Sequence, residues 1–139
     1  MDGVRTYVTF KSGAFNVAEP KDHYSHPNNF GDDLAKWLMQ ALEQRGYRVG
    51  EGLKQEDHGW YFIYWVGDRA YEFIVGYRGE EEWLGWVERK VGLLASLFGG
   101  RKRGIQPQAT LAIESVLSSE PQIRAMRWHF GEDLISEKA

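Results

Sequence analysis

The chain of 139 residues contains 7 phenylalanines, 7 tyrosines and 6 tryptophans but no cysteine. A chain of this length buries roughly two thirds of its unfolded surface on folding, which leaves room for one sizeable core. We therefore expect a single domain over residues 1–139, with the polar segment 131–139 fraying at its end. The absence of cysteine excludes a disulfide framework and a thiolate metal site.

The charge balance excludes a strongly basic protein. The 17 basic and 20 acidic residues give a net charge of -3, so the chain lacks the positive field typical of nucleic-acid binders. No apolar stretch approaches the roughly 20 residues that span a bilayer, and the first residues lack the basic, apolar and small-residue order of a signal peptide. We expect a cytoplasmic protein that binds neither membranes nor nucleic acid.

The N-terminal third of the chain predicts strands followed by a loop. Residues 4–10 alternate between apolar and polar side chains, which is typical of a half-buried strand. A second short strand over residues 14–18 could pair back on the first as a hairpin. Residues 19–29 contain two prolines, two histidines and two asparagines and therefore predict a loop.

Two amphipathic helices are expected. The first follows from one apolar stripe at helical spacing, formed by Leu34, Trp37, Leu38, Ala41 and Leu42. Asn28 or Asn29 is a candidate N-cap, and Gly46 suits the left-handed position after the last turn. The second helix begins near Pro107 and ends before Pro121, with the same spacing of apolar residues.

The middle and the end of the chain predict further strands. Residues 60–66 and 71–77 are rich in β-branched and aromatic residues, and Gly67 and Asp68 between them favour a tight turn. Residues 83–89 fit either a strand or part of a helix, and the strand is preferred because Gly85 and Gly92 would weaken the helix. Residues 91–98 would then form a helical turn, and residues 122–129 a closing strand.

This order of elements predicts the fold class. Runs of neighbouring strands imply hairpins, so the sheet should be mainly antiparallel. We expect an α+β fold with about five to six strands and two helices packed on one face.

The first candidate site combines His23 and His26 with the cluster Glu56, Asp57 and His58. Imidazoles and carboxylates could hold zinc or iron with an open position for water, as in a small metal-dependent hydrolase. The spacing of the histidines does not force both rings to one side, because they lie in a loop. Solvent-exposed loop histidines are the simpler interpretation.

The string from Gln55 to Trp60 is a second candidate. Adjacent carboxylates at Glu56 and Asp57 could do acid or base work with His58 as a proton carrier. In an extended chain the two carboxylates point to opposite faces, so the favoured interpretation is a strand entry where Gly59 relieves the backbone.

The E-D-x-G-W string over residues 56–60, the LLASLFGG segment and the IRAMRW segment near the end together resemble a group of small, uncharacterised bacterial proteins. The likeness covers residues 30–128. It implies a bacterial α+β domain and supplies neither an activity nor a catalytic residue.

The sequence lacks the common motifs of enzymes and of nucleic-acid-binding proteins. The sequence contains no G-x-S-x-G, P-loop, G-x-G-x-x-G or H-E-x-x-H motif, so we expect no bound cofactor and lean against an enzyme. The basic run 101–103 could meet a few phosphates, but a solvated loop is the better interpretation, because no nucleic-acid-binding motif accompanies it.

The aromatic residues themselves give the leading hypothesis. Aromatic strands place side chains on both faces of a sheet whose helices cover only one, and exposed aromatic patches mark interaction sites. The hypothesis is a non-catalytic binding module, similar in class to bacterial immunity or accessory proteins, that contacts a protein partner or forms a homodimer. The alternative is that the loops 19–29 and 99–104 cover that face. The candidate binding residues are Tyr61, Trp65, Tyr77, Trp83 and Trp86.

Overall fold

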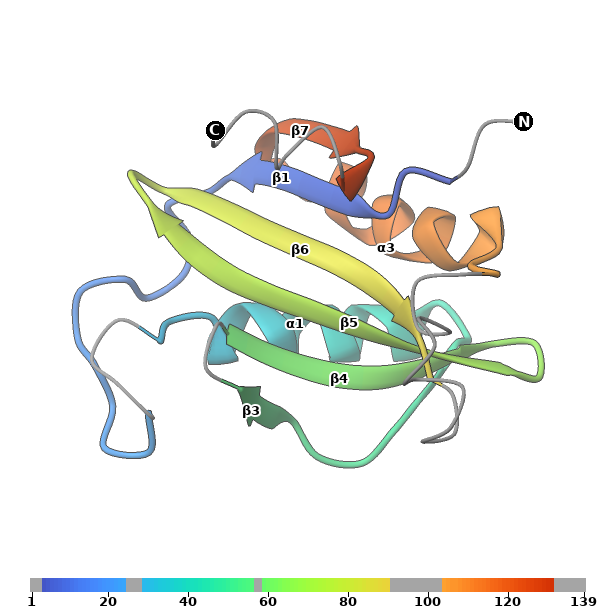
Figure 1. The fold of residues 1–139 in the computed structure, drawn as a ribbon. Helices are drawn as coiled ribbons and strands as arrows, with labels where there is room; N and C mark the ends of the chain where they lie inside the picture. Colours follow the sequence, from blue (N-terminus) through green and yellow to red (C-terminus); the bar gives the residue numbers. More distant parts are fainter. Residues whose placement is uncertain (1–3, 25–28, 57–58, 91–103, 132–139) are drawn as a thin grey trace.

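The computed structural model describes residues 4–24, 29–56, 59–90 and 104–131. The elements follow one another in the order β1 (Tyr7–Lys11), α1 (Asp32–Gln44), β2 (Arg48–Val49), β3 (Lys54–Glu56), β4 (Gly59–Val66), β5 (Arg69–Gly79), β6 (Glu82–Arg89), α3 (Pro107–Ser119) and β7 (Arg124–His129) (Figure 1). The predicted α+β class with a mainly antiparallel sheet is confirmed.

Among the described residues, all seven strands belong to one sheet. Six of them follow the order β2-β4-β5-β6-β1-β7, and β3 also pairs with β4. Every pair of neighbouring strands is antiparallel. The count slightly exceeds the five to six strands expected, because β2 and β3 are only 2 and 3 residues long. Such short segments carry no alternation that a sequence pattern can detect.

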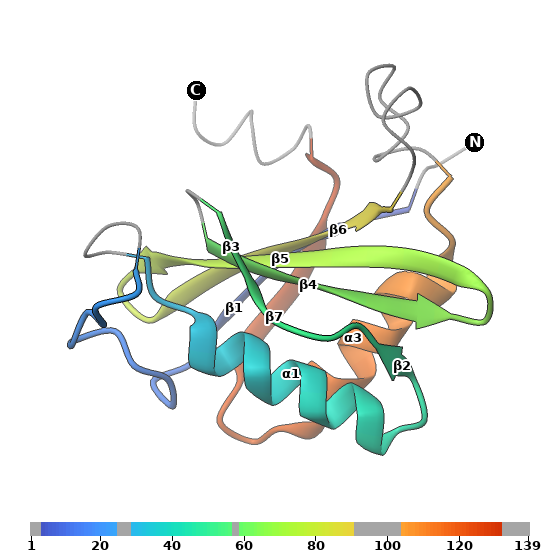
Figure 2. The same ribbon diagram turned by 90° about the horizontal axis from the view of Figure 1, so that it is seen from below.

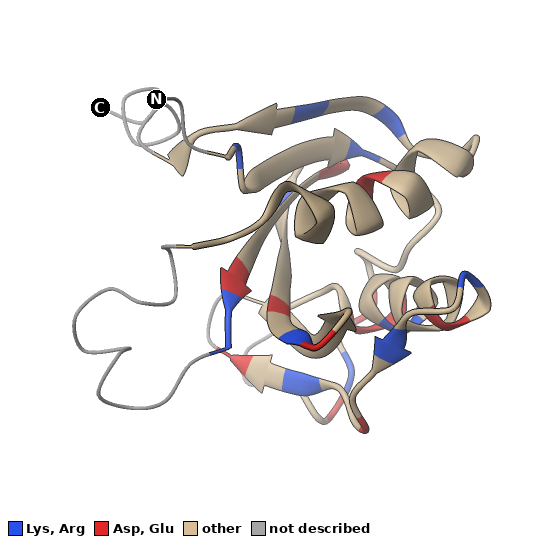
Figure 3. Ribbon diagram, turned by 90° about the vertical axis from the view of Figure 1, so that its right-hand side faces the viewer, with Lys and Arg blue, Asp and Glu red and all other residues tan. Residues whose placement is uncertain are grey.

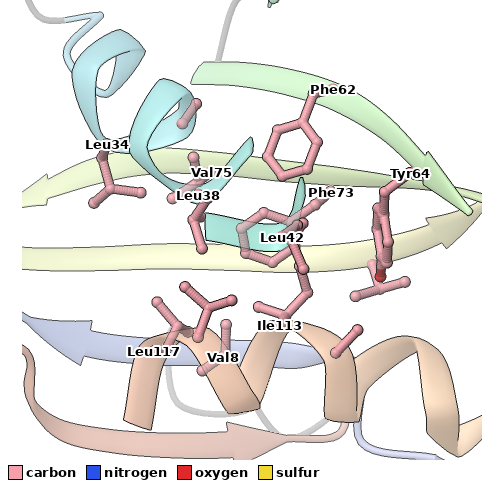
Figure 4. Packing of buried hydrophobic residues seen from close by; sticks show 14 of the residues in the cluster. Val8, Leu34, Leu38, Leu42, Phe62, Tyr64, Phe73, Val75, Ile113 and Leu117 are labelled. Atoms are coloured by element: carbon pink, nitrogen blue, oxygen red, sulfur yellow. The ribbon is translucent and has the colours of Figure 1, made fainter. Parts of the chain in front are cut away.

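Both helices lie on the same face of the sheet (Figure 2). On β4, the buried residues alternate with half-buried ones, so every second side chain points toward the helices. The core lies between the two layers (Figure 4). Its sheet side includes Val8, Phe62, Tyr64, Phe73 and Val75, and its helix side includes Leu34, Leu38, Leu42, Ile113 and Leu117.

The ends of α1 agree only in part with the sequence. Gly46 has φ 91°, and the amides of Gly46 and Tyr47 donate to the carbonyls of Glu43 and Leu42, each at 3.0 Å, which is a Schellman ending. The start differs, because Gly31 is the N-cap residue and no side chain caps the helix. Asn29 does not act as the cap; its amide instead donates toward the β3 strand, and Asn28 lies outside the described residues.

The predicted strand over residues 14–18 is absent, and no hairpin forms with β1. The Asn16 side chain accepts hydrogen bonds from the amides of Ala18 and Glu19 at 3.2 and 3.1 Å, which curls the chain locally. The backbone N–H of Asn16 donates a hydrogen bond to the Asp33 carboxylate of α1 at 2.8 Å. The segment therefore docks on α1, and β1 pairs with β6 and β7 instead.

Residues 82–89 form the strand β6, as preferred over a helix. β6 pairs with β5 on one side and with β1 on the other, so its backbone is satisfied as a central strand. Gly85 is also needed there, because a Cβ at this position would lie 2.4 Å from Cζ of Phe73. The helical turn expected over residues 91–98 falls outside the described residues.

Within the described ranges, no helix combines the length and the apolar character that a membrane span requires.

Candidate interaction surface

The sheet face opposite the helices, called here the helix-free face, carries one continuous cross-strand row. The strand registers place Tyr61 beside Ile74, Ile74 beside Trp86, and Trp86 beside Tyr7. Side chains opposite one another on neighbouring antiparallel strands are in reach of contact. Four strands therefore contribute one apolar row across the middle of this face. Tyr7 was missed by the sequence analysis, although it alternates with buried residues of the same strand.

Trp86 and Tyr7 form the centre of this row. Their rings stack with centroids 5.7 Å apart and an interplanar angle of 22°. The Trp86 indole N–H donates to Oε2 of Glu88 on the same face at 3.2 Å. Both interactions hold the indole in one orientation, so the row has a fixed shape.

Trp65 lies toward the β2 edge of the same face. The Arg48 guanidinium of β2 sits over its ring, 4.1 Å from the centroid, which is a cation–π contact. Between Trp65 and Tyr61 on β4 lies Ile63, whose cross-strand neighbour is Glu72. The edge of the face is thus cationic and its middle carries a carboxylate.

The aromatic side chains of this face are half-buried, not fully exposed. This holds for Tyr7, Tyr61, Trp65 and Trp86, and Ile74 between them is only 4% exposed. In the described part of the chain, Leu111 of α3 is the one large hydrophobic residue that is mostly exposed, at 55%. The helix-free face therefore offers partly covered aromatic rings and flanking charges.

Two of the predicted surface residues lie on the other side of the sheet. Trp83 is 0% exposed, and its indole N–H donates to the Ser12 carbonyl at 3.3 Å. Tyr77 is its cross-strand neighbour and packs against the core, with ring centroids 5.0 Å apart. The prediction that Trp83 and Tyr77 contribute to an open face is wrong. Trp83 and Trp86 are three residues apart, so in a strand they must point to opposite faces.

A cluster of polar side chains, called here the Asp32 junction, lies at the start of α1. It consists of Lys21, His23, Tyr24 and Asp32. The Asp32 carboxylate is 1% exposed at the start of α1. It accepts hydrogen bonds from the Tyr24 hydroxyl at 2.8 Å and the Lys21 ammonium at 3.0 Å, and the His23 Nε2 lies 3.1 Å away. The junction therefore anchors the loop before α1 to the helix.

The contacts of the Asp32 junction shift the pKa values of the Asp32 carboxyl and the Tyr24 hydroxyl. Burial alone would raise the pKa of Asp32, but the hydrogen bonds from Lys21, Tyr24 and His23 outweigh it and lower that pKa. Burial, followed by the hydrogen bond to the Asp32 carboxylate, raises the pKa of Tyr24. Asp32 is thus a buried carboxylate whose hydrogen-bond donors favour its ionised form.

The cluster expected around Glu56 is tied to the same region. The Gln55 amide donates to the His23 carbonyl at 2.8 Å, and the Asn29 amide donates to Oε1 of Gln55 at 2.8 Å and to the Glu56 carbonyl at 3.2 Å. The Trp60 indole N–H donates to the Asn29 carbonyl at 2.8 Å. These contacts tie the start of β4 to the loop before α1 through the Gln55 side chain and the Glu56 backbone, and the strand-entry interpretation of the two carboxylates stays a prediction. Asp57 and His58 lie outside the described residues.

The predicted metal set is not assembled in the described ranges, which contain no group of three or more metal-ligating side chains. The His23 ring faces Asp32 beside a hollow of about 340 Å³, lined by His23, Asp32, Lys36, Leu53 and Trp60. Because His26, Asp57 and His58 lie outside the described residues, the hydrolase alternative stays a prediction. Metal analysis of protein purified without a histidine tag tests it. The basic run 101–103 also falls outside these ranges.

The geometry defines an α+β domain with an aromatic, helix-free sheet face. No family model matches the chain, and no curated protein or solved structure shows a significant similarity to it. The resemblance to uncharacterised bacterial proteins therefore stays a prediction.

Proposed function

We propose that the protein is a non-catalytic binding module that presents its helix-free face to a folded protein partner. The observation that carries the proposal is the row formed by Tyr61, Ile74, Trp86 and Tyr7 across four strands. Tyrosine and tryptophan are enriched in protein interfaces, where one side of the ring is buried and the other meets the partner.

Preorganisation of the row supports this function. Trp86 is held by stacking on Tyr7 and by its hydrogen bond to Glu88, and Trp65 is held by Arg48. Side chains that are already fixed lose little conformational entropy when a partner binds. The rings therefore suit the role of anchors at the centre of an interface.

The charges on the face favour a protein over a nucleic acid. Glu72 and Glu88 are neighbours across β5 and β6 in the middle of the face, while Arg48 and Lys54 flank it. Central carboxylates would repel phosphates, whereas mixed charges around an apolar row are typical of protein interfaces. Among protein binders, the role we propose is that of a bacterial immunity or accessory protein, as an expectation from the class of domain, since a fold alone assigns no function.

The test compares tryptophans on the two sides of the sheet. Trp65→Ala and Trp86→Ala remove anchors from the helix-free face, and Trp37→Ala on α1 removes a half-buried tryptophan on the opposite side. Each variant is immobilised and exposed to lysate of the source cells, and its own assembly is measured by light scattering. We expect one specific partner to bind the wild type and the Trp37 variant and to be lost with both face variants.

Circular dichroism establishes that each variant is folded before the comparison. Equal capture by all three variants would contradict the proposal. A stable dimer of the wild type that dissociates in the face variants would replace the separate partner with a second copy of the chain.

A further inference from the structure

The strand β7 forms one edge of the sheet. Its partner is β1 on one side, and among the described residues no other strand pairs with it. Backbone N–H and C=O groups that point away from β1 therefore have no ladder partner, which makes the edge a template for a further strand. β7 is the uppermost strand in Figure 3, where blue marks the Lys and Arg positions along its ribbon.

A hollow of about 190 Å³ lies on the helix side of this edge, between α3, β7 and the start of β1. Leu111, the exposed large hydrophobic residue of α3, contributes to it. The Trp128 indole nitrogen is buried and has no hydrogen-bond partner within the described ranges. A buried N–H without an acceptor is costly, so the described residues leave this corner of the edge incompletely satisfied. The hollow is lined by Val4, Arg5, Thr110, Leu111, Glu114 and Trp128.

The opposite side of the same edge is cationic. Arg127 is exposed, lies beside Thr9 on the helix-free side, and has no acidic partner among the described residues. Arg124 is also exposed and is paired with Glu81 at 2.6 Å. An extended chain laid along β7 would therefore meet a positive charge on one of its faces and, on the other, a hollow of mixed lining whose exposed apolar member is Leu111.

We propose that the β7 edge docks an extended segment of a protein partner whose side chains alternate between acidic and apolar. The segment adds to the sheet as an extra strand, with an apolar side chain in the hollow beside Leu111 and a carboxylate toward Arg127. This inference goes beyond the proposed function, because it uses the β7 edge and not the aromatic row of the helix-free face.

The charges argue against a second copy of the chain as the occupant. Antiparallel pairing of two β7 strands would place arginines of both copies on the same side of the joined sheet, and like charges opposite one another destabilise a strand pair. Ala125, with φ 56°, lies where the register to β1 shifts, so any strand added at this edge, a partner segment included, pairs over a short stretch. An acidic strand avoids the repulsion between arginines, because its carboxylates lie opposite Arg127.

Nuclear magnetic resonance of the full chain tests the proposal. The probe is a synthetic peptide of about eight residues with alternating glutamate and valine, and the control peptide replaces glutamate with lysine. We expect the glutamate peptide to shift the Trp128 indole signal and the amide signals of Met126 and Arg127. Saturation is expected in the millimolar range, as is typical for an unoptimised peptide.

Two variants and a matched control assign the site. Arg127→Glu should weaken binding of the glutamate peptide roughly fivefold and strengthen binding of the lysine peptide. Leu111→Gln should weaken both by removing the apolar anchor. Arg78→Glu reverses an equally exposed arginine on the distant strand β5 and should change neither the site nor the shifted signals.

Four outcomes would overturn the proposal. The first is that neither peptide shifts the β7 signals, and the second is that both peptides shift them equally. The third is that the chain dimerises and that Arg127→Glu strengthens or abolishes the dimer, which would assign the edge to a second copy. The fourth is binding that occurs only after residues 132–139 are removed, which would assign the edge to the chain's own C-terminal segment. None of these results depends on the aromatic row of the helix-free face, so the two proposals fail separately.

Discussion

Gly59 lies so close to Val75 that a Cβ at position 59 would stand 2.1 Å from the Val75 carbonyl oxygen. Its φ of 152° is also a conformation that residues with side chains rarely adopt. We expect Gly59→Ala to lower the free energy of unfolding by about 3 kcal/mol or more, because both the backbone and the neighbouring strand must move. Urea denaturation followed by tryptophan fluorescence measures the change.

Gly52→Ala is the control for this prediction. Gly52 also has a positive φ, 81°, but nothing lies within 4 Å of the position a Cβ would take. Its cost should be limited to the conformational term, about 1 kcal/mol. If both variants lower the free energy of unfolding equally, the close approach of Gly59 to the Val75 carbonyl does not contribute to the cost.

The Asp32 junction predicts a loss of stability in acid. The folded-state pKa of Asp32 lies below its ordinary value of 3.8, which the unfolded chain retains. Its contribution is therefore complete above that value and disappears as the pH falls through the lower, folded-state pKa. In Asp32→Asn, the amide meets the donors of Lys21 and Tyr24, so we expect a loss of about 2 kcal/mol at neutral pH.

The measurement is the free energy of unfolding from neutral pH down to the acid range, for the wild type and for Asp32→Asn. The variant's curve should be flatter below the ordinary pKa, since the group that binds a proton on unfolding is gone. Asp22→Asn changes an exposed carboxylate of the same loop and serves as control. Parallel curves for the wild type and Asp32→Asn would show that another carboxylate dominates acid unfolding.

Tyr64 links the sheet to α3 through one buried hydrogen bond. Its hydroxyl donates to the Ala109 carbonyl at 2.8 Å, and the side chain is 0% exposed. Tyr64→Phe leaves that carbonyl without its donor, and we expect a loss of about 1–2 kcal/mol. Burial also raises the pKa of Tyr64, so part of the stability should be lost when the pH rises past 10, the ordinary value for the unfolded chain.

Thermal unfolding across the alkaline range checks both parts of this prediction. The wild type should lose stability more steeply than Tyr64→Phe above the ordinary tyrosine pKa. Tyr61→Phe on the helix-free face is the matched control and should change little. If Tyr64→Phe is as stable as the wild type, the bond to Ala109 contributes nothing net.

The fold could be predicted because its long elements carry strong patterns. The apolar stripe of α1 and the alternation in β5 each determine which side is buried. The short strands β2 and β3 could not be predicted, since they form only by pairing with β4. Nor could the docking of Asn16 on Asp33, because this contact joins residues 17 positions apart in sequence.

The sequence predicts which aromatic residues belong to the sheet, but not which face of the sheet each side chain occupies. Trp65 and Trp86 do lie on the helix-free face, whereas Trp83 and Tyr77 point into the core. Their sequence spacing contains this information once the register of β6 is known, because residues an odd number apart in a strand face opposite sides. The Asp32 junction was not anticipated, since a carboxylate in a first helical turn usually faces solvent and interacts with the helix dipole.

The opposite orientations of Trp83 and Trp86 predict unequal costs for the same substitution. Trp83 is 0% exposed and contacts Tyr77 and Phe15, so Trp83→Ala should lower the free energy of unfolding by about 3–5 kcal/mol by leaving a cavity. Trp86 is half-buried on the helix-free face, and Trp86→Ala should cost roughly 1–2 kcal/mol, mainly from its stack on Tyr7. Guanidinium denaturation of both variants, followed by circular dichroism, gives the two values. A larger loss for Trp86→Ala than for Trp83→Ala would mean that the register of β6 against β5 is shifted by one residue, which would also move the aromatic row to the helix side.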